Sequence, residues 1–365
     1  MSGQHAVLAP SSAARWYQCS GSVKLEVLYP QEETDKSREG TLAHAVCAAL
    51  LQGSTAPAGA TDEMLEGADL YVDEIRKYVD NGMPLLIESR VDCSYVDPNC
   101  WGTPDAWAVD RAAGTLYVWD YKFGRRHVEV FENWQLIAYA AGILEVAGLS
   151  NGANIHTVRM AVVQPRSYHP DGPVRSWQVS VADLQGYFVK LSMRAKSAMR
   201  SDAPTSVGSE CRDCSARHAC PALQSSAYSA MERAGENVPF DMPPEALGRE
   251  LTVMSAAAAV LNARISGLEN EILGNIKRGV AVRGWATEQG TGREKWSRPI
   301  EEILALGEMM GIAVSKPGAI TPKQAVKAGL PAAVVAGYTE TPKGEIKLVS
   351  DNGSFTRKIF QGASK

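Results

Sequence analysis

Two aspartates and a lysine are spaced along one stretch of the sequence as the hydrolysis of a phosphodiester by a metal ion would require. Asp105 closes the segment Gly102-Thr103-Pro104-Asp105, and fifteen residues later Asp120 stands two positions before Lys122. Carboxylates are hard ligands for Mg²⁺ or Mn²⁺, and such an ion polarises a phosphate and lowers the pKa of a bound water. Lys122 would orient that water or stabilise the charge that develops on the phosphate.

The elements that carry these residues are predicted to be strands. Three segments rich in Val, Leu, Ile, Trp and Tyr, separated by turn residues, predict a meander over 84–95, 102–110 and 115–121. Asp120 and Lys122 lie two apart in the third strand, so their side chains project from the same face. An Asp-x-Lys at a strand end is more often a surface ion pair, so the interpretation needs further support.

Polar residues on two predicted helices supply that support. The apolar segment 131–149 carries Gln135 and Tyr139 four residues apart, hence on one helix face. His44 follows Gly40-Thr41-Leu42-Ala43 near the start of another apolar helix, where a neutral imidazole could be a metal ligand, although a helix histidine is more often structural. Glu88, in the first predicted strand, is either a supporting acid or a surface residue.

The order of these residues resembles the RecB-type branch of the PD-(D/E)XK nuclease superfamily, in its D-x-K variant. The resemblance implies an α/β restriction-endonuclease-like core, with a central mixed sheet flanked by helices. It implies that His44, Asp105 and Asp120 bind a metal ion, Mg²⁺ or Mn²⁺, together with the backbone carbonyl of Tyr121. The catalytic residues that it implies are Asp105, Asp120, Lys122, Gln135 and Tyr139, of which the last two face the active site and the DNA.

Four cysteines extend the resemblance. Cys211-x2-Cys214-x5-Cys220 is followed by Pro221, and a solitary Cys19 lies in the first predicted helix. This pattern resembles the iron-sulfur nucleases of the CRISPR-associated and AddB types. The resemblance implies a [4Fe-4S] cluster that staples the two ends of the nuclease domain together. Four thiolates also suit tetrahedral Zn²⁺, which is the alternative occupant.

The other three cysteines predict no disulfide framework. Cys47 is expected to be a buried hydrophobe, and Cys93 and Cys100 flank a turn. We find no N-terminal apolar segment flanked by basic residues and expect no run long enough to span a membrane, so we expect a protein of the reducing cytoplasm without a membrane partner.

Composition and charge fit an enzyme. The chain has 365 residues, 45% of them hydrophobic and 21% charged, and a net charge of -4, which excludes a generally basic DNA-coating protein. A local basic groove remains compatible, because Lys122, Arg125, Arg126 and His127 follow one another after the third strand. The alternative for this cluster is a solvated turn.

The chain is predicted to contain a nuclease domain, a linker and an extension. Residues 1–225 form the nuclease domain, which begins with a helical region over 11–82 and continues after the meander with strands at 154–164 and 174–180 and a helix near 181–200. Residues 226–245 are a linker. Residues 246–365 form a helical and hairpin extension: a long amphipathic helix from Leu251 to Ile272, a hairpin over 280–299, a short helix capped by Thr321-Pro322, and a basic tail from 320.

The function expected from these observations is that of a DNA exonuclease that acts on single strands or DNA ends in phage recombination, replication or DNA processing. The extension resembles an uncharacterised RecB-like family common in bacteriophages, which implies a phage or prophage gene expressed in a bacterial host. A recombination or replication protein and a second copy of the chain are the partners considered. The alternatives are a non-catalytic DNA-binding or assembly module of the same fold and a zinc-stabilised scaffold.

Overall fold

The computed structural model describes residues 6–30, 33–79, 82–151, 154–233 and 242–287, with single positions at 309, 331 and 333. The chain divides into one compact unit of residues 1–285 with 352–365, and another of 286–351. The helices and strands below all belong to the first unit. The predicted hairpin over 280–299, the helix starting at Thr321-Pro322 and the basic tail lie largely or wholly outside the described residues.

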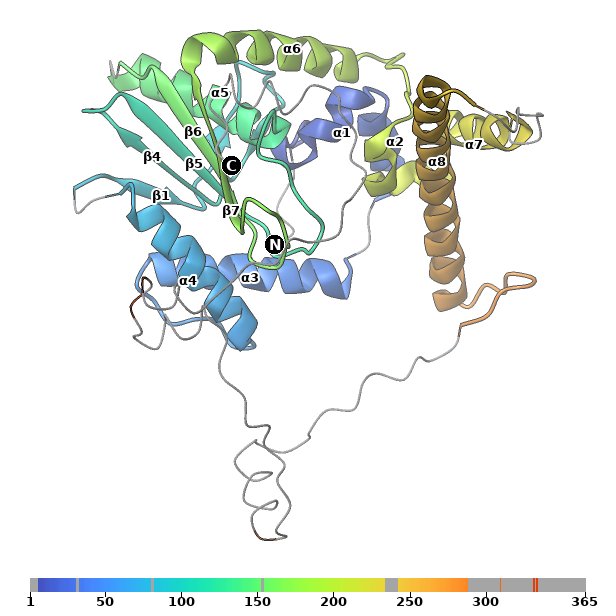
Figure 1. Ribbon diagram of the computed structural model, residues 1–365, viewed down its shortest axis with the longest axis horizontal. Helices are drawn as coiled ribbons and strands as arrows, with labels where there is room; N and C mark the ends of the chain where they lie inside the picture. Colours follow the sequence, from blue (N-terminus) through green and yellow to red (C-terminus); the bar gives the residue numbers. More distant parts are fainter. Residues whose placement is uncertain are drawn as a thin grey trace. The chain divides into compact units, whose positions relative to one another are not determined.

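A five-stranded mixed sheet forms the centre of this unit (Figure 1). Its strands run in the order β1 (Leu85–Ile87), β4 (Ala106–Asp110), β5 (Thr115–Tyr121), β6 (Thr157–Val163) and β7 (Val174–Ser180). The β5–β6 pair is parallel and the other pairs are antiparallel. Central strand β5 is buried at nearly every position, as its run of apolar and aromatic residues requires. The structure therefore has the α/β architecture and the mixed sheet that the sequence predicts.

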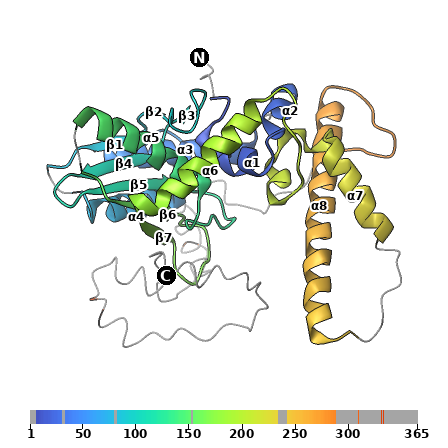
Figure 2. The same cartoon turned by 90° about the horizontal axis from the view of Figure 1, so that it is seen from above.

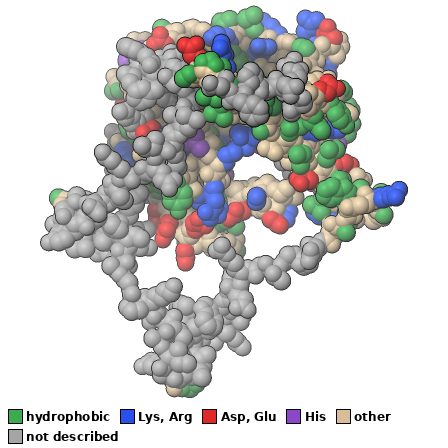
Figure 3. All heavy atoms as spheres, turned by 45° about the vertical axis from the view of Figure 1, so that its right-hand side comes forward, with side chains coloured by type: hydrophobic (Ala, Val, Ile, Leu, Met, Phe, Trp, Pro, Cys, Tyr) green, Lys and Arg blue, Asp and Glu red, His purple; other side chains and the backbone are tan. Residues whose placement is uncertain are grey.

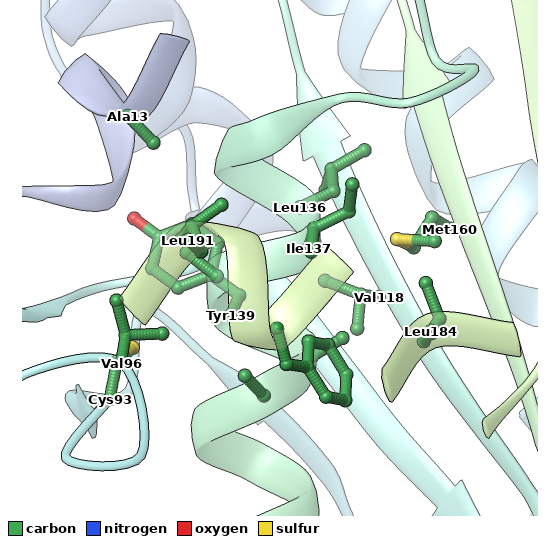
Figure 4. Close-up of a cluster of buried hydrophobic side chains, with 14 of the residues drawn as sticks. Ala13, Cys93, Val96, Val118, Leu136, Ile137, Tyr139, Met160, Leu184 and Leu191 are labelled. Atoms are coloured by element: carbon green, nitrogen blue, oxygen red, sulfur yellow. The ribbon is translucent and has the colours of Figure 1, made fainter. Parts of the chain in front are cut away.

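Helices cover both faces of the sheet (Figures 1 and 2). Leu116 and Val118 of β5 pack with α5 (Trp134–Asn151) and α6 (Val181–Met199), while Trp119 and Tyr121 point to the other face, towards α3 (Asp35–Leu51) and α4 (Asp62–Arg76). Figure 4 shows the first of these cores, where Val118 and Met160 from the sheet lie beside side chains of α5 and α6. Successive side chains of β5 thus point into two different cores, one on each face of the sheet. The polar residues Asp120 and Lys122 lie at the C-terminal end of the strand.

Local sequence signals fix where the helices begin. Thr34 caps α3 by accepting from the Ser37 N–H at 3.1 Å, and the Ser37 hydroxyl accepts in return from the Thr34 N–H at 2.9 Å. Ser180 caps α6 by accepting from the Asp183 N–H at 3.0 Å. These caps satisfy N–H groups that have no partner inside the helix.

The first predicted strand, 84–95, is wrong as a single element. It divides into β1 and a short strand β2 (Val91–Asp92), which pairs with β3 (Trp101–Gly102) in a separate two-stranded sheet. The division occurs at Glu88, whose φ of +46° turns the chain out of the extended region. This turn places the Glu88 carboxylate at the end of β1.

The N-terminal segment packs against residues about 190 positions later in the sequence. The segment comprises η1 (Pro10–Ser12), α1 (Ala13–Gln18) and α2 (Ser22–Leu28), and it contacts η2 (Ser209–Asp213) and η3 (Ser215–His218). The Ser206 N–H donates to the Cys19 thiol at 3.3 Å, and the Gly21 N–H donates to the Pro204 carbonyl at 2.8 Å. The two ends of the predicted nuclease domain therefore meet.

The predicted linker at 226–245 is partly helical. Helix α7 (Pro221–Arg233) crosses residue 225, residues 234–241 lie outside the described ranges, and α8 (Pro244–Lys277) confirms the predicted long helix. α8 approaches η3 closely through Gly267, where an added Cβ would lie 2.7 Å from the Arg217 side chain. Its buried positions are therefore small residues rather than the predicted apolar seam, whose Leu251 and Ile265 are about half exposed.

Among the described residues, one helix, α8, is long and apolar enough to cross a membrane when judged by length and composition alone. The uncharged residues between Glu250 and Asn262, which are mostly Ala, Val, Leu and Met, produce this result.

Candidate metal centre and cysteine pocket

Three potential metal ligands converge beside the edge of the sheet where β1 ends and β4 begins. His44 comes from the middle of α3, Glu88 follows β1, and Asp105 precedes β4. One ligand atom from each of them lies within 4.8 Å of those of the other two, and within the described part of the chain no other such group of three is found. An imidazole and two carboxylates in this arrangement form a candidate site for a divalent cation.

Asp105 holds this group together through both of its carboxylate oxygens. Oδ1 lies 3.0 Å from Nδ1 of His44, and Oδ2 accepts from the Tyr121 N–H at 2.6 Å. Burial alone would raise the pKa of Asp105, but His44, Lys122 and the Tyr121 N–H lower it overall. The pKa of His44 is raised, because the charge and hydrogen bond of Asp105 outweigh the effect of burial. Asp105 is thus kept ionised, as a metal ligand must be.

Glu88 is the member that sequence reasoning left open. Desolvation and the negative charge of Asp105 raise the pKa of Glu88 to about 7, while His44 opposes the shift. Its N–H donates to the Asp105 carbonyl at 3.1 Å, which fixes the turn that carries it. In the sequence, Glu88 follows a short apolar segment. This position is equally compatible with an acid on the surface and with an acid that lies beside His44 and Asp105.

A second polar network lies next to the first, on the side of α5. Oδ1 of Asp120 accepts from Nζ of Lys122 at 2.9 Å and from Nε2 of Gln135 at 3.0 Å, and the Gln135 Oε1 accepts from Lys122 at 3.2 Å. Burial raises the pKa of Asp120 against the opposing effect of Lys122, and Asp120 and Asp105 raise the pKa of Lys122 although burial opposes them. Lys122 is therefore an ammonium ion beside a carboxylate.

One carboxylate oxygen of this network lacks a hydrogen-bond donor. Oδ2 of Asp120 is buried and finds no hydrogen-bond partner among the described residues. A buried carboxylate oxygen without a donor is costly unless a cation or water satisfies it. This free acceptor is the observation that best supports Asp120 as an additional metal ligand beside His44, Glu88 and Asp105.

The two tyrosines of the predicted site have other contacts. The ring of Tyr121 is fully buried on the α4 side, while its N–H binds Asp105. Tyr139 is only 4% exposed, and its hydroxyl donates to the Thr103 carbonyl at 3.2 Å. Its ring packs against Gly102, where an added Cβ would lie 3.0 Å from it, and Figure 4 shows the Tyr139 side chain within the core. Tyr139 supports the loop that carries Asp105, and the expectation that it faces the active site and the DNA stays a prediction.

The predicted basic cluster after β5 is held by acidic partners. Arg126 pairs with Asp213 at 2.9 Å, and Arg125 lies 4.0 Å from Glu63. On the face drawn in Figure 3, Lys and Arg side chains lie close to Asp and Glu side chains. The Arg126–Asp213 pair connects the loop after β5 to the residue preceding Cys214, so this loop links the two candidate sites.

Gln164 fixes that loop from inside the protein. Its side chain is fully buried, and its Nε2 donates to the carbonyls of Gly124 and Arg126 at 2.7 and 2.5 Å. Its Oε1 accepts from the Val128 N–H at 3.1 Å and from Arg175 at 2.9 Å. Every hydrogen-bonding position of this amide is used.

Gln164→Leu is therefore expected to lower the free energy of unfolding by about 3 kcal/mol or more, since each buried group left unpaired costs about 1–3 kcal/mol. Urea denaturation of the purified protein measures this difference. Gln178→Leu is the matched control, because Gln178 is exposed on β7 and a surface change there is expected to stay within about 0.5 kcal/mol. Equal stability of both variants would contradict the role given to Gln164.

The four cysteines predicted to act together line one pocket. Cys19 comes from the end of α1, Cys211 from η2, Cys214 from the junction of η2 and η3, and Cys220 from the residue before α7. The Gly208 N–H donates to the Cys211 sulfur at 3.4 Å, as the Ser206 N–H does to Cys19. No three of these sulfurs, all on described residues, lie within 4.8 Å of one another.

Burial raises the pKa of two thiols of this pocket, Cys214 and Cys211. It raises the pKa of Cys214 to about 12 and also raises that of Cys211, where the charges of Cys19 and Cys220 add to the effect. Cys47 is buried as predicted, at 2% exposure. Cys93 and Cys100 are buried core residues rather than incidental ones, and all seven cysteines, which lie within the described ranges, are free thiols.

Comparisons with known proteins give a family and distant structural neighbours. A family model described as "Protein of unknown function (DUF2800)" matches residues 5–352. Among solved structures, an alkaline exonuclease from Laribacter hongkongensis is similar over 51% of this chain and 92% of its own, with 12% identity and a TM-score of 0.24. A likeness at this TM-score carries no argument about function.

Proposed function

We propose that this chain, which belongs to the DUF2800 family, is a metal-dependent nuclease that hydrolyses phosphodiester bonds in DNA. The observation that carries the proposal is the convergence of His44, Glu88 and Asp105 next to the network of Asp120, Lys122 and Gln135. A binding module has no need of an ammonium held between a buried carboxylate and a cluster of metal ligands. The proposed nuclease domain covers residues 1–225.

The residues fit a divalent cation, Mg²⁺ or Mn²⁺. His44, Glu88 and Asp105, whose ligand atoms converge, would hold it, with Asp120 and the Tyr121 carbonyl as the further ligands that the resemblance implies. The bound ion supplies a polarised phosphate and a water of lowered pKa. Two observations support this ligand set: Oδ2 of Asp120 lacks a hydrogen-bond donor, and the pKa of Asp105 is lowered, which favours its ionised form.

Lys122 would bind the phosphate, and Gln135 would hold Lys122 in position. The Lys122 ammonium, about one-quarter exposed, can donate both to Asp120 and to an oxygen of a phosphate placed beside the cation. Gln135 fixes the positions of Asp120 and Lys122, since one end of its amide binds each. The proposed role of Gln135 is therefore to position the two reacting groups, and that of Tyr139 to position the loop that carries Asp105.

We further propose that Cys19, Cys211, Cys214 and Cys220 hold a [4Fe-4S] cluster. Their convergence on one pocket and the two N–H groups that donate to sulfur support it. A single tetrahedral Zn²⁺ is the alternative occupant of the same four thiolates.

The proposed substrate is linear DNA, cut from an end in phage recombination, replication or DNA processing. The purified protein, incubated with Mg²⁺ or Mn²⁺, is expected to degrade end-labelled linear single-stranded DNA while sparing covalently closed circles of the same sequence. The measurement is the rate of label release, with EDTA as the control for metal dependence.

Two outcomes would change the proposal. Equal cutting of closed circles would replace the exonuclease by an endonuclease that uses the same metal site. No metal-dependent cleavage of any DNA would leave a DNA-binding or assembly module of the same fold.

A further inference from the structure

Helix α8 carries an apolar seam that follows a heptad repeat. The residues of this seam alternate spacings of four and three along the helix: Leu247, Leu251, Met254, Ala258, Leu261, Ile265, Leu268 and Ile272. The pattern therefore repeats every seven residues, which is the period at which two helices wind around each other and keep one seam in contact. A helix that only packs on a globular core follows a period of about 3.6 residues and has a broader apolar face.

The seam points away from the part of the structure on which α8 packs. The buried residues of α8 are Ala263 and Gly267, and Gly267 lies against η3. At about 100° per residue, these two positions lie on the side of the helix opposite the seam. Leu251 is 50% exposed and Ile265 is 51% exposed. The other large seam residues that are exposed are Leu247, Met254 and Leu268.

The residue types of the seam match those of a two-stranded coiled coil. In the heptad, Ile265 and Ile272 take the a positions, and Leu261 and Leu268 take the d positions. A β-branched residue at a with Leu at d favours two parallel strands. A second copy of α8 offers the same residues at the same spacing, so it matches the seam along its whole length.

The charges beside the seam favour the parallel orientation. In a parallel pair, position g of one helix faces position e of the next heptad in the other, so Arg264 meets Glu269 of the other copy. In an antiparallel pair that keeps the seam in register, Glu250 would instead face Glu271 of the other copy, and like charges repel. Arg264 uses Nη1 on the His218 carbonyl, so its other nitrogens can donate to an acid.

We propose that two copies of this chain associate through α8 as a parallel, in-register coiled coil. This inference is independent of the proposed nuclease function. The seam is about 37 Å long and the helix about 10 Å wide, so the facing area is roughly 400 Å² per copy. The total of about 800 Å² is at the low end for specific interfaces. The expected dimer is therefore reversible, with a Kd on the order of 1–10 µM.

Sedimentation velocity of the full-length protein at increasing concentration tests this surface. The measured mass should rise from the 39.2 kDa of one chain towards twice that value. Leu251→Glu is expected to raise the Kd by about tenfold or more, because it places a charge in the core of the coiled coil. Val253→Glu is the matched control, since Val253 is 54% exposed on the same helix but lies outside the seam. Its Kd should change by less than about twofold.

The fold of both variants is checked by thermal melting and circular dichroism. Ile265→Glu replaces Leu251→Glu if the latter does not fold, because Ile265 is an equally exposed seam residue in the other half of the helix.

A cysteine in the seam tests the orientation of the two helices. In the parallel pair, Met254 of each copy lies opposite Met254 of the other, so Met254→Cys should form a disulfide between copies in oxidised glutathione. In the antiparallel pair Met254 would face Ile265, and no such bond could form. Val253→Cys and the unmodified protein, treated in the same way, should remain single chains on a non-reducing gel.

Three results would overturn the proposal in whole or in part. A chain that stays monomeric at about 100 µM, far above the expected Kd, would exclude a second copy as the occupant of the seam. Equal effects of Leu251→Glu and Val253→Glu would place the interface elsewhere. A dimer in which Met254→Cys does not cross-link would exclude the parallel arrangement.

Discussion

Asp120→Asn is expected to reduce metal-dependent DNA cleavage by about 10³-fold or more, because it removes the negative charge that Lys122 and the cation share. The substitution keeps the size of the side chain, and the amide oxygen can still accept from Lys122 and Gln135. Stability is therefore expected to change by no more than about 1 kcal/mol. Initial rates on end-labelled DNA and thermal melts measure the two effects.

The matched control for this prediction is Asp110→Asn. Asp110 ends β4 at the edge opposite Asp105, where it accepts from the N–H groups of Ala112 and Ala113. Its variant is expected to cleave DNA at the rate of the unmodified protein. Full activity in Asp120→Asn would remove Asp120 from the proposed site.

Mn²⁺ binding separates the two ways in which Asp120 could act. If its Oδ2 is a ligand, Asp120→Asn weakens Mn²⁺ binding as Glu88→Gln does, and calorimetry detects both losses. If Asp120 only positions Lys122, Mn²⁺ affinity stays at the level of the unmodified protein while the cleavage rate still falls.

Cys19→Ser is expected to prevent binding of the proposed [4Fe-4S] cluster and to lower stability more than any other single change considered. The link between Cys19 and Cys211 closes a loop of 192 residues, for which the entropic contribution is on the order of 5 kcal/mol. Protein purified without oxygen should be brown and contain iron and sulfide, whereas the variant should be colourless and melt at a lower temperature.

Cys47→Ala is the control for the cysteine prediction. Cys47 is a buried thiol in the core between α3 and α4 and does not line the cysteine pocket. Its variant should keep the colour and the full iron content. Stoichiometric zinc without iron in the unmodified protein would assign the pocket to Zn²⁺, and an iron-replete Cys19→Ser protein would remove Cys19 from the ligands.

Patterns set by neighbours in the chain predicted the structure well. The apolar run of β5, the strand at 174–180 and the helix near 181–200 lie where the sequence placed them, because each is determined by its own residues and caps. Gln135 contacts Asp120 as its helix position suggested. In these cases, the periodicity of apolar residues was enough to predict which face of the helix or strand is buried.

Features decided by distant partners could not be predicted in the same way. Tyr139 shares a helix face with Gln135, and the contact of its ring with Gly102, 37 residues earlier in the sequence, could not be predicted from the helix alone. Glu88 lies beside His44 and Asp105 because its left-handed backbone conformation ends the strand. The residue types at this position do not predict a φ of +46°. The helical part of the predicted linker was missed because the prolines at 239, 243 and 244 outweighed the helix-forming Ala, Met and Glu that precede them.

The contact between the N-terminal helices and residues 204–215 has a consequence for synthesis on the ribosome. Cys19 and Ser206, which are hydrogen-bonded to one another, are 187 residues apart. At about 5–20 residues per second, the first helix waits roughly 10–40 s before its partner has been made. During that interval Trp16, buried in the finished protein, is exposed to solvent together with its apolar neighbours. Nascent chains that stop before residue 204 should therefore bind chaperones rather than fold, and the N-terminal segment would be their principal chaperone-binding site.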